Sequence, residues 1–123
     1  MFEIKVTEYF ESAHQIDGHN GKCQNLHGHN WKVEVICEAE SLDEIGMACD
    51  FYEVRLELKE VITPLDHVHL NTLEPFQKAN PTSENVAKYI YKKMKEKVKK
   101  FNGVCLKAVV VFETDRYSAK YYE

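Results

Sequence analysis

Residues 2–14 read FEIKVTEYFESAH, and this stretch decides the kind of fold that the chain can adopt. Its side chains alternate. One side carries a mostly apolar set that ends in a histidine, namely Phe2, Ile4, Val6, Phe10, Ser12 and His14. Glu8 interrupts this set, while Lys5, Thr7 and Glu11 take the other side. A period of two over this length predicts a long strand with one buried face.

A second stretch, residues 27–39, reads HGHNWKVEVICEA and alternates in the same way. The positions on its apolar side are His27, His29, Trp31, Val33, Val35 and Cys37. Between the two stretches, residues 15–25 are polar and include Gly18 and Gly21, which is typical of a loop. The two stretches therefore predict a pair of hairpin strands, with Trp31 packed in the core.

Two helices follow. Asp50 and Glu53 have the spacing of a capping box, and apolar residues recur at helical spacing from there to Pro64. Residues 65–80 look irregular. Pro81 and Thr82 begin the second helix, because proline fits a first helical turn, and Asn102-Gly103 ends it. Its apolar stripe comprises Val86, Ile90, Met94, Val98 and Phe101.

The chain closes with two further apolar, strand-like runs, Val104 to Phe112 and about Arg116 to Tyr122. The order is ββααββ. Strands that are neighbours in sequence usually pair as hairpins, so we expect an α+β fold in which a four-stranded antiparallel sheet carries both helices on one face. The length of 123 residues predicts a single domain over 1–123. The two free sheet edges invite pairing between copies of the chain.

Composition limits the classes of function. The 16 basic and 20 acidic side chains give a formal charge of −4, which argues against a dedicated nucleic-acid binder. A lysine stripe on the second helix (Lys88, Lys92, Lys95, Lys99) is read as a solvated face, with nucleic-acid binding as the alternative. No apolar run approaches the roughly 18 residues of a membrane span. The start, MFEIKVTEYF, lacks the pattern of a signal peptide, so we expect a cytoplasmic protein.

The four cysteines contain no C-x-x-C pair, which excludes a four-thiolate zinc knot, and we expect reduced thiols. Cys37 and Cys105 lie in apolar runs and are predicted to be small core residues. Cys23 differs because it lies in the polar loop beside histidines. It could be a fourth metal ligand in a closed structural site, or a catalytic group beside an open one; spacing alone leaves both possibilities.

His27 and His29 are two residues apart on a strand, so their rings share one face. His14 ends the preceding strand on its inward side. Three neutral imidazoles suit Zn²⁺ and leave a fourth position open, which is the catalytic pattern. Further along, Asp66 precedes His67, and such a carboxylate can orient an imidazole for proton transfer. The alternatives are a polar strand end and a surface helix cap.

Taken together, these residues resemble the 6-pyruvoyl-tetrahydropterin synthase family, and within it the queuosine-pathway branch of 6-carboxytetrahydropterin synthases. The resemblance covers nearly the whole chain. It rests on the order and separation of six motifs: F-E-S-A-H (10–14), C-x-x-x-H-G-H-N (23–30), G-M-A-C-D-F (46–51), L-D-H (65–67), N-P-T-S-E-N (80–85) and F-E-T (112–114). The three-residue gap between Cys23 and H-G-H separates this branch from animal 6-pyruvoyl enzymes, in which the gap is longer.

The resemblance implies the tunnelling fold, with trimers stacked into a homohexamer and active sites between subunits. It assigns the residues as follows: zinc to His14, His27 and His29, proton transfer to Cys23, Asp66 and His67, the pterin anchor to Glu113, and closure around the ring to Thr82, Ser83 and Glu84. Gln15 stands where many relatives have arginine, so the triphosphate contacts are less defined. His19 and Lys22 are our candidates for them.

The implied reaction is that of a zinc-dependent lyase. It converts 7,8-dihydroneopterin triphosphate to 6-carboxy-5,6,7,8-tetrahydropterin, acetaldehyde and triphosphate, in queuosine (7-deazapurine) biosynthesis. The redox change is internal to the substrate, and no G-x-G-x-x-G nucleotide motif is present. Two alternatives stay open: 6-pyruvoyl-tetrahydropterin synthase or a related pterin aldol cleavage, and a zinc-stabilised binding protein without enzymatic activity.

Overall fold

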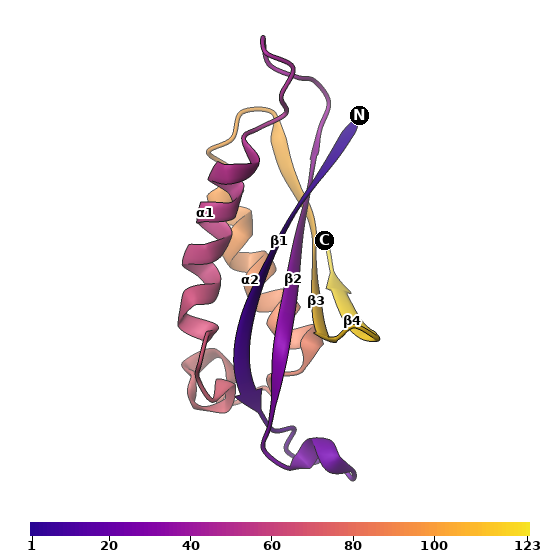
Figure 1. Ribbon diagram of the computed structural model, residues 1–123, viewed down its shortest axis with the longest axis vertical. Helices are drawn as coiled ribbons and strands as arrows, with labels where there is room; N and C mark the ends of the chain where they lie inside the picture. The colour runs from indigo at the N-terminus through magenta and orange to yellow at the C-terminus, as the bar shows by residue number, and fades with distance from the viewer.

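The computed structural model describes all 123 residues as one sheet backed by two helices (Figure 1). The strands are β1 (Phe2–His14), β2 (His27–Ala39), β3 (Val104–Thr114) and β4 (Tyr117–Tyr121). They lie in the order β1-β2-β3-β4, and every neighbouring pair is antiparallel. Both α1 (Phe51–Ile62) and α2 (Ser83–Val98) cover the same face. The predicted ββααββ order and its layering are confirmed.

β1 and β2 pair in one unbroken register, from Phe2 opposite Ala39 to His14 opposite His27. On β2 the predicted inward residues from Trp31 to Cys37 are buried, whereas His27 and His29 are half-buried. Trp31 is fully enclosed, and its indole N–H donates to the Ser12 carbonyl at 3.1 Å. Glu8, which interrupts the apolar pattern of β1, forms an ion pair with Arg55 of α1. A charge on the helix-facing side is thus tolerated because the helix supplies its partner.

The helix starts agree with their expected caps, with two differences, but α2 ends at Val98 and not at the predicted Asn102-Gly103. Asp50 caps α1 by accepting a bond from the Tyr52 N–H at 2.8 Å, but Glu53 returns no bond, so the capping box is one-sided. Thr82 caps α2, accepting from the Asn85 N–H at 3.1 Å. Pro81 therefore lies before the cap rather than in the first turn. Its carbonyl remains free for another partner, which is described below.

The connection between the helices, predicted to be irregular, forms three short 3₁₀ turns, at Thr63–Leu65, Leu70–Thr72 and Glu74–Phe76. Part of it runs along the outer edge of β1: the Ala13 N–H donates to the Val68 carbonyl at 3.0 Å, and Ala13 bridges His69 in parallel. The loop 15–26 and this connection gather at the same end of the molecule (Figure 1). That end contains the candidate site.

One core prediction is wrong. Cys37 is buried, but Cys105 is exposed. A register shift in the β2–β3 pairing at Ile36/Cys37 places Glu38 opposite Cys105, and the thiol projects away from the helices. All four cysteines are free, in agreement with the expected reduced thiols.

The lysine stripe of α2 is partly neutralised. Lys92 and Lys95 share Glu123, and Lys99 pairs with Glu96, whereas Lys88 makes no ion pair. All four side chains are exposed to solvent. None of the helices is long and apolar enough to cross a membrane.

Candidate active site

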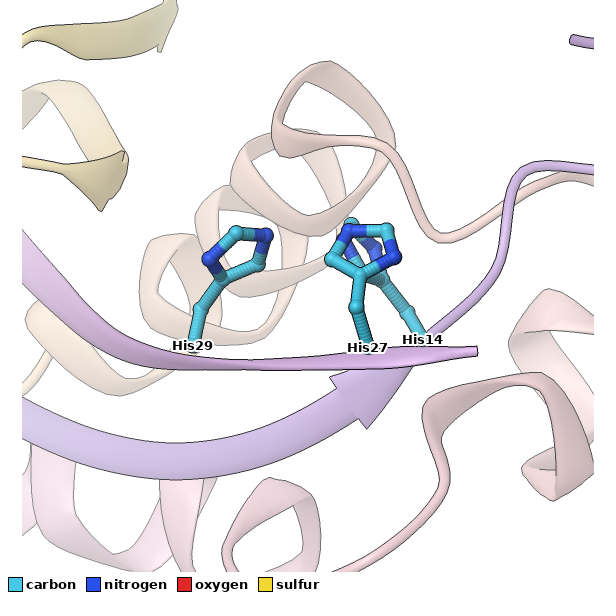
Figure 2. Close-up of side chains that lie close together, drawn as sticks. All are labelled: His14, His27 and His29. Carbon is cyan, nitrogen blue, oxygen red and sulfur yellow. The ribbon is translucent and has the colours of Figure 1, made fainter. Parts of the chain in front are cut away.

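Three histidines meet at the open end of the first hairpin. His14 is the last residue of β1, and His27 and His29 lie at the start of β2. One nitrogen from each ring lies within 4.8 Å of the other two. Figure 2 shows the three rings standing on the same side of the two strands. The period of two in both strands and their unbroken register produce this cluster, as predicted.

Hydrogen bonds fix which nitrogen of two rings can bind a metal. His14 Nδ1 lies 2.7 Å from the Pro81 carbonyl, and His27 Nδ1 lies 2.7 Å from the Asn25 carbonyl. A carbonyl oxygen can only accept, so each Nδ1 carries the hydrogen and each Nε2 keeps its lone pair. Outer contacts of this kind orient metal-binding histidines and select their tautomer.

The unpartnered nitrogens fit a metal ion. His14 Nε2 and His29 Nε2 are buried and have no hydrogen-bond partner. Buried polar atoms normally have partners, so such a pair needs an explanation. A divalent ion would satisfy both, and a set of three imidazoles suits Zn²⁺. The residues therefore fit the metal that the sequence predicts, although other divalent ions bind imidazole as well.

Burial also keeps two of the rings in their ligand form. Desolvation lowers the pKa of His14 and of His29, against the opposing effect of the Glu113 carboxylate. The Pro81 carbonyl opposes it too at His14, where it favours the protonated ring. Since desolvation dominates, both imidazoles are neutral at pH 7. Metal ligation requires this neutral form.

Cys23 does not belong to the metal group, which consists of the three histidines alone. It lies in a 3₁₀ turn, Lys22–Gln24, and is half-buried. Its carbonyl accepts a bond from the Ile16 N–H at 2.7 Å. The closed four-ligand site, one of the two alternatives for Cys23, is therefore not formed, and the histidine site keeps an open position.

Asp66 and His67 form the predicted pair, but the pair lies at the edge of β1 and outside the histidine cluster. Asp66 Oδ1 lies 2.9 Å from His67 Nδ1 and also accepts the Glu11 N–H at 2.9 Å. His67 has a left-handed backbone, φ 55°, which is uncommon for a residue with a side chain. Its side chain is 72% exposed at the free edge of β1. Within one chain, the pair is not brought to the histidine cluster.

The two groups modify each other's acidity. The hydrogen bond that the His67 ring donates to the Asp66 carboxylate raises the pKa of His67. The Glu11 backbone N–H, followed by His67, lowers the pKa of Asp66. Glu11 also places a carboxylate oxygen 3.4 Å from His67 Nε2, a partner that the sequence analysis missed. Only the pairing of β1 with residues 66–69 could have identified it.

Glu113 lies beside the histidines, as its assignment requires. Its carboxylate oxygens are 3.7 Å from His14 Nε2 and 3.9 Å from His29 Nε2. These separations are too long for hydrogen bonds, and because both rings are neutral the contacts are not ion pairs. A cavity of about 540 Å³ opens here, and its walls are Glu11, Ser12, Gly28, His29, Asn30, Glu113, Thr114 and Asp115. Three of these residues are acidic and none is Lys or Arg, which favours a ligand edge rich in N–H donors.

The segment at the start of α2 is joined to the cluster through Pro81, whose carbonyl holds the His14 ring. Thr82 is engaged as the helix cap, Ser83 is buried, and Glu84 is exposed in the first turn. The two candidates for phosphate contacts, His19 and Lys22, are exposed, and no hydrogen bond or ion pair joins either of them to the histidines or to Glu113.

The fold and this site define an α+β protein with an open three-histidine centre. A family model described as 6-pyruvoyl tetrahydropterin synthase matches residues 3–123, and the chain belongs to that family. The resemblance found in the sequence motifs is thereby confirmed.

Relatives within the family point to one branch. The chain is 36% identical to 6-carboxy-5,6,7,8-tetrahydropterin synthase of Synechocystis sp., over 92% of this chain and 87% of that protein. It is 30% identical to the protein of the same name from Haemophilus influenzae, over the full length of both. Among solved structures, 6-pyruvoyl tetrahydropterin synthase of Caenorhabditis elegans matches with a TM-score of 0.87 and 28% identity, over 99% of this chain and 95% of that one. The expected tunnelling fold is confirmed.

Proposed function

We propose that this protein is a lyase that converts 7,8-dihydroneopterin triphosphate and one water to 6-carboxy-5,6,7,8-tetrahydropterin, acetaldehyde and triphosphate. The observation that carries the proposal is the likeness, along most or all of the chain, to two proteins named 6-carboxy-5,6,7,8-tetrahydropterin synthase. The open three-histidine site supports it. The pterin ring gains two hydrogens while the side chain is oxidised, so no external redox cofactor is required.

His14, His27 and His29 would hold the metal through their imidazole nitrogens, and we propose Zn²⁺. A divalent ion in this position supplies Lewis-acid chemistry, which makes the carbon-bound hydrogen next to a coordinated hydroxyl group more acidic. Glu113 would accept hydrogen bonds from the N–H and amino edge of the pterin, because its carboxylate lies in the cavity beside the histidines. Thr82, Ser83 and Glu84 would close around the same ring.

Cys23 would remove the proton as its thiolate, and His67, oriented by Asp66, would return a proton to the substrate. Because Asp66 and His67 lie exposed at the edge of β1, we infer that they act in the site of a neighbouring copy. The outer edge of β1 is free before Glu11, where residues 66–69 begin to pair with it, and β4 leaves the opposite edge free; copies could join into a ring through these edges. We propose a homohexamer of two stacked trimers.

The acidic cavity beside Glu113 would repel a triphosphate. We propose that the phosphate chain instead points toward the exposed loop that carries His19 and Lys22. We also propose that the chain acts as a single domain, in the cytoplasm, in queuosine biosynthesis.

A second activity, 6-pyruvoyl-tetrahydropterin synthase, is favoured by the likeness to the Caenorhabditis elegans protein of that name. It begins from the same substrate and needs the same proton removal. The two reactions diverge only when the side chain is cleaved.

The test is product identification. The metal-loaded protein is incubated with 7,8-dihydroneopterin triphosphate, acetaldehyde is trapped, and the pterin is identified by mass. A 6-carboxy pterin with an equimolar amount of acetaldehyde is the expected result. A 6-pyruvoyl pterin without acetaldehyde would move the protein to the sister activity, and no product with full metal occupancy would refute both.

A further inference from the structure

Two asparagine side chains hold the loop that follows β1 in the way that a neighbouring strand would. The Gln15 N–H donates to Asn71 Oδ1 at 2.9 Å, and Asn71 Nδ2 donates back to the Gln15 carbonyl at 2.9 Å. The Asp17 N–H donates to Asn80 Oδ1 at 3.1 Å, and Asn80 Nδ2 donates back to the Asp17 carbonyl at 2.9 Å. Each primary amide thus replaces a peptide group, using its donor and its acceptor together.

These bonds continue a pattern that begins within β1. The backbone of Glu11 is held by the Asp66 carboxylate and by the His67 N–H, and the Ala13 N–H is held by the Val68 carbonyl. Residues 11, 13, 15 and 17 therefore all bond to residues 66–80 through their backbones. β1 ends at His14, but its outer edge remains satisfied for three more residues because side-chain amides take over from the backbone.

The two clamped residues flank the contact that positions Cys23. Ile16 lies between Gln15 and Asp17, and its N–H donates to the Cys23 carbonyl at 2.7 Å. The other backbone bonds of residues 18–25 are made within the loop itself, at short range, as in His19 to Ile16 and Asn25 to Lys22. The position of Cys23 relative to the rest of the molecule therefore depends on the two amide clamps and on the start of β2.

The same segment also fixes a metal-binding ring. Asn80 is followed directly by Pro81, whose carbonyl accepts the His14 Nδ1–H at 2.7 Å. The Asn80 carbonyl in turn accepts bonds from the Thr82 N–H and from Asn85 Nδ2, both at 2.8 Å, which anchor it to the start of α2. The Asn80 side chain holds the loop that carries Cys23, and the neighbouring Pro81 carbonyl holds the His14 ring. A change in the Asn80 side chain would therefore let the Cys23 loop move relative to His14.

We propose that Asn71 and Asn80 are positioning residues that set the place of the Cys23 thiol relative to the three histidines. The catalytic part of this inference rests on the proposed function, in which Cys23 removes the proton. The structural part, that the two asparagines hold the Cys23 loop in place, rests on the hydrogen bonds alone. Breaking either clamp loosens the loop without removing a metal ligand or a group that touches substrate.

The test uses the full-length protein and four variants at the two clamps. N71A and N80A remove both bonds of a clamp, whereas N71D and N80D retain an acceptor for the backbone N–H and lose the donor. N20A is the matched control, because Asn20 is exposed in the same loop and makes no hydrogen bond. Zinc content per chain is measured for each. The rate of Cys23 alkylation by iodoacetamide is followed by mass spectrometry, with the exposed Cys105 as internal reference.

We expect N71A and N80A to retain full zinc and to change the Cys23-to-Cys105 alkylation ratio by about tenfold, the scale expected for two lost hydrogen bonds. Turnover of 7,8-dihydroneopterin triphosphate should fall in kcat by a similar factor with little change in KM, and the Asp variants should lie between. N20A should match the parent in every readout. Should the alanine variants fold poorly, the Asp variants carry the same comparison.

The inference is overturned if the clamp variants lose thermal stability but keep the parental alkylation ratio and kcat, since the asparagines would then only stabilise the fold. It is also overturned if N20A changes the ratio as much as they do. If the parent makes no pterin product at all, the proposed function fails. In that case the alkylation ratio alone decides whether the two amides position Cys23.

Discussion

Replacing His14 or His27 by alanine removes one metal ligand in either case, but the two variants should differ sharply in stability. The His14 ring is fully buried, and its Nδ1–H satisfies the Pro81 carbonyl. The His27 ring is partly exposed, and its bond to Asn25 lies at the surface. The two positions therefore separate the cost of losing the ligand from the cost of losing a packed ring.

The expected magnitude follows from these contacts. In metal-free protein, H14A leaves a cavity that costs about 3 kcal/mol. It also unpairs the Pro81 carbonyl at a cost of about 1 kcal/mol and removes the unpartnered Nε2, which returns about 1 kcal/mol. The net loss is about 3 kcal/mol, or about 12 °C in Tm at about 4 °C per kcal/mol for a chain of this size. H27A should cost about 1 kcal/mol or less.

Thermal unfolding of chelator-treated protein, at one fixed chain concentration, measures this difference. A second series with added zinc measures linkage: the parent should gain about 3 kcal/mol when free zinc is 100 times Kd, and neither variant should gain that much at the same zinc concentration. Equal destabilisation of metal-free H14A and H27A would refute the account of His14 burial. A parental zinc response in either variant would refute the three-histidine site.

Three further predictions concern the other residues. C23A should keep stoichiometric zinc, measured by elemental analysis, and lose turnover by about 10²- to 10⁴-fold, the usual contribution of a proton-transfer group; parental activity would remove Cys23 from the mechanism. E113Q should raise KM by about tenfold or more, because it replaces an ionised acceptor, and steady-state kinetics with unchanged kcat would check this. D66N should shift the limb of the pH–rate profile due to His67 to lower pH, because the Asp66 hydrogen bond is the leading cause of its raised pKa; a profile identical to that of the parent would contradict the pairing.

Local patterns were sufficient to predict the strands and the histidine cluster. Both hairpin strands follow a period of two, which only Glu8 interrupts, and a hairpin brings their ends together, so the pattern assigns His14, His27 and His29 to one face. The helix starts followed from Asp50 and Thr82, whose side chains act within one turn. Interactions between residues that are close in the sequence can therefore be predicted from the sequence pattern.

The features that could not be predicted all depend on contacts between distant parts of the chain. The position of Asp66 and His67 at the edge of β1 depends on pairing with Glu11, and nothing in the motif L-D-H indicates that partner. The left-handed conformation of His67 occurs where its N–H bonds to the distant Glu11 carbonyl. Cys105 was misplaced because a register shift between two strands, unlike an alternating pattern, has no local signature here.

The unbroken β1–β2 register has a consequence for how this protein can tolerate changes in length. Inserting one residue near the middle of β1 would exchange its two faces beyond that point, so Phe10 and His14 would leave the helix side together. Such an insertion would damage the hydrophobic core and the metal site at once. Residues 18–22 bond only at short range and lie outside this constraint. Length variation that preserves the fold should therefore accumulate there, and this stretch is where new ligand contacts could be engineered without disturbing the sheet.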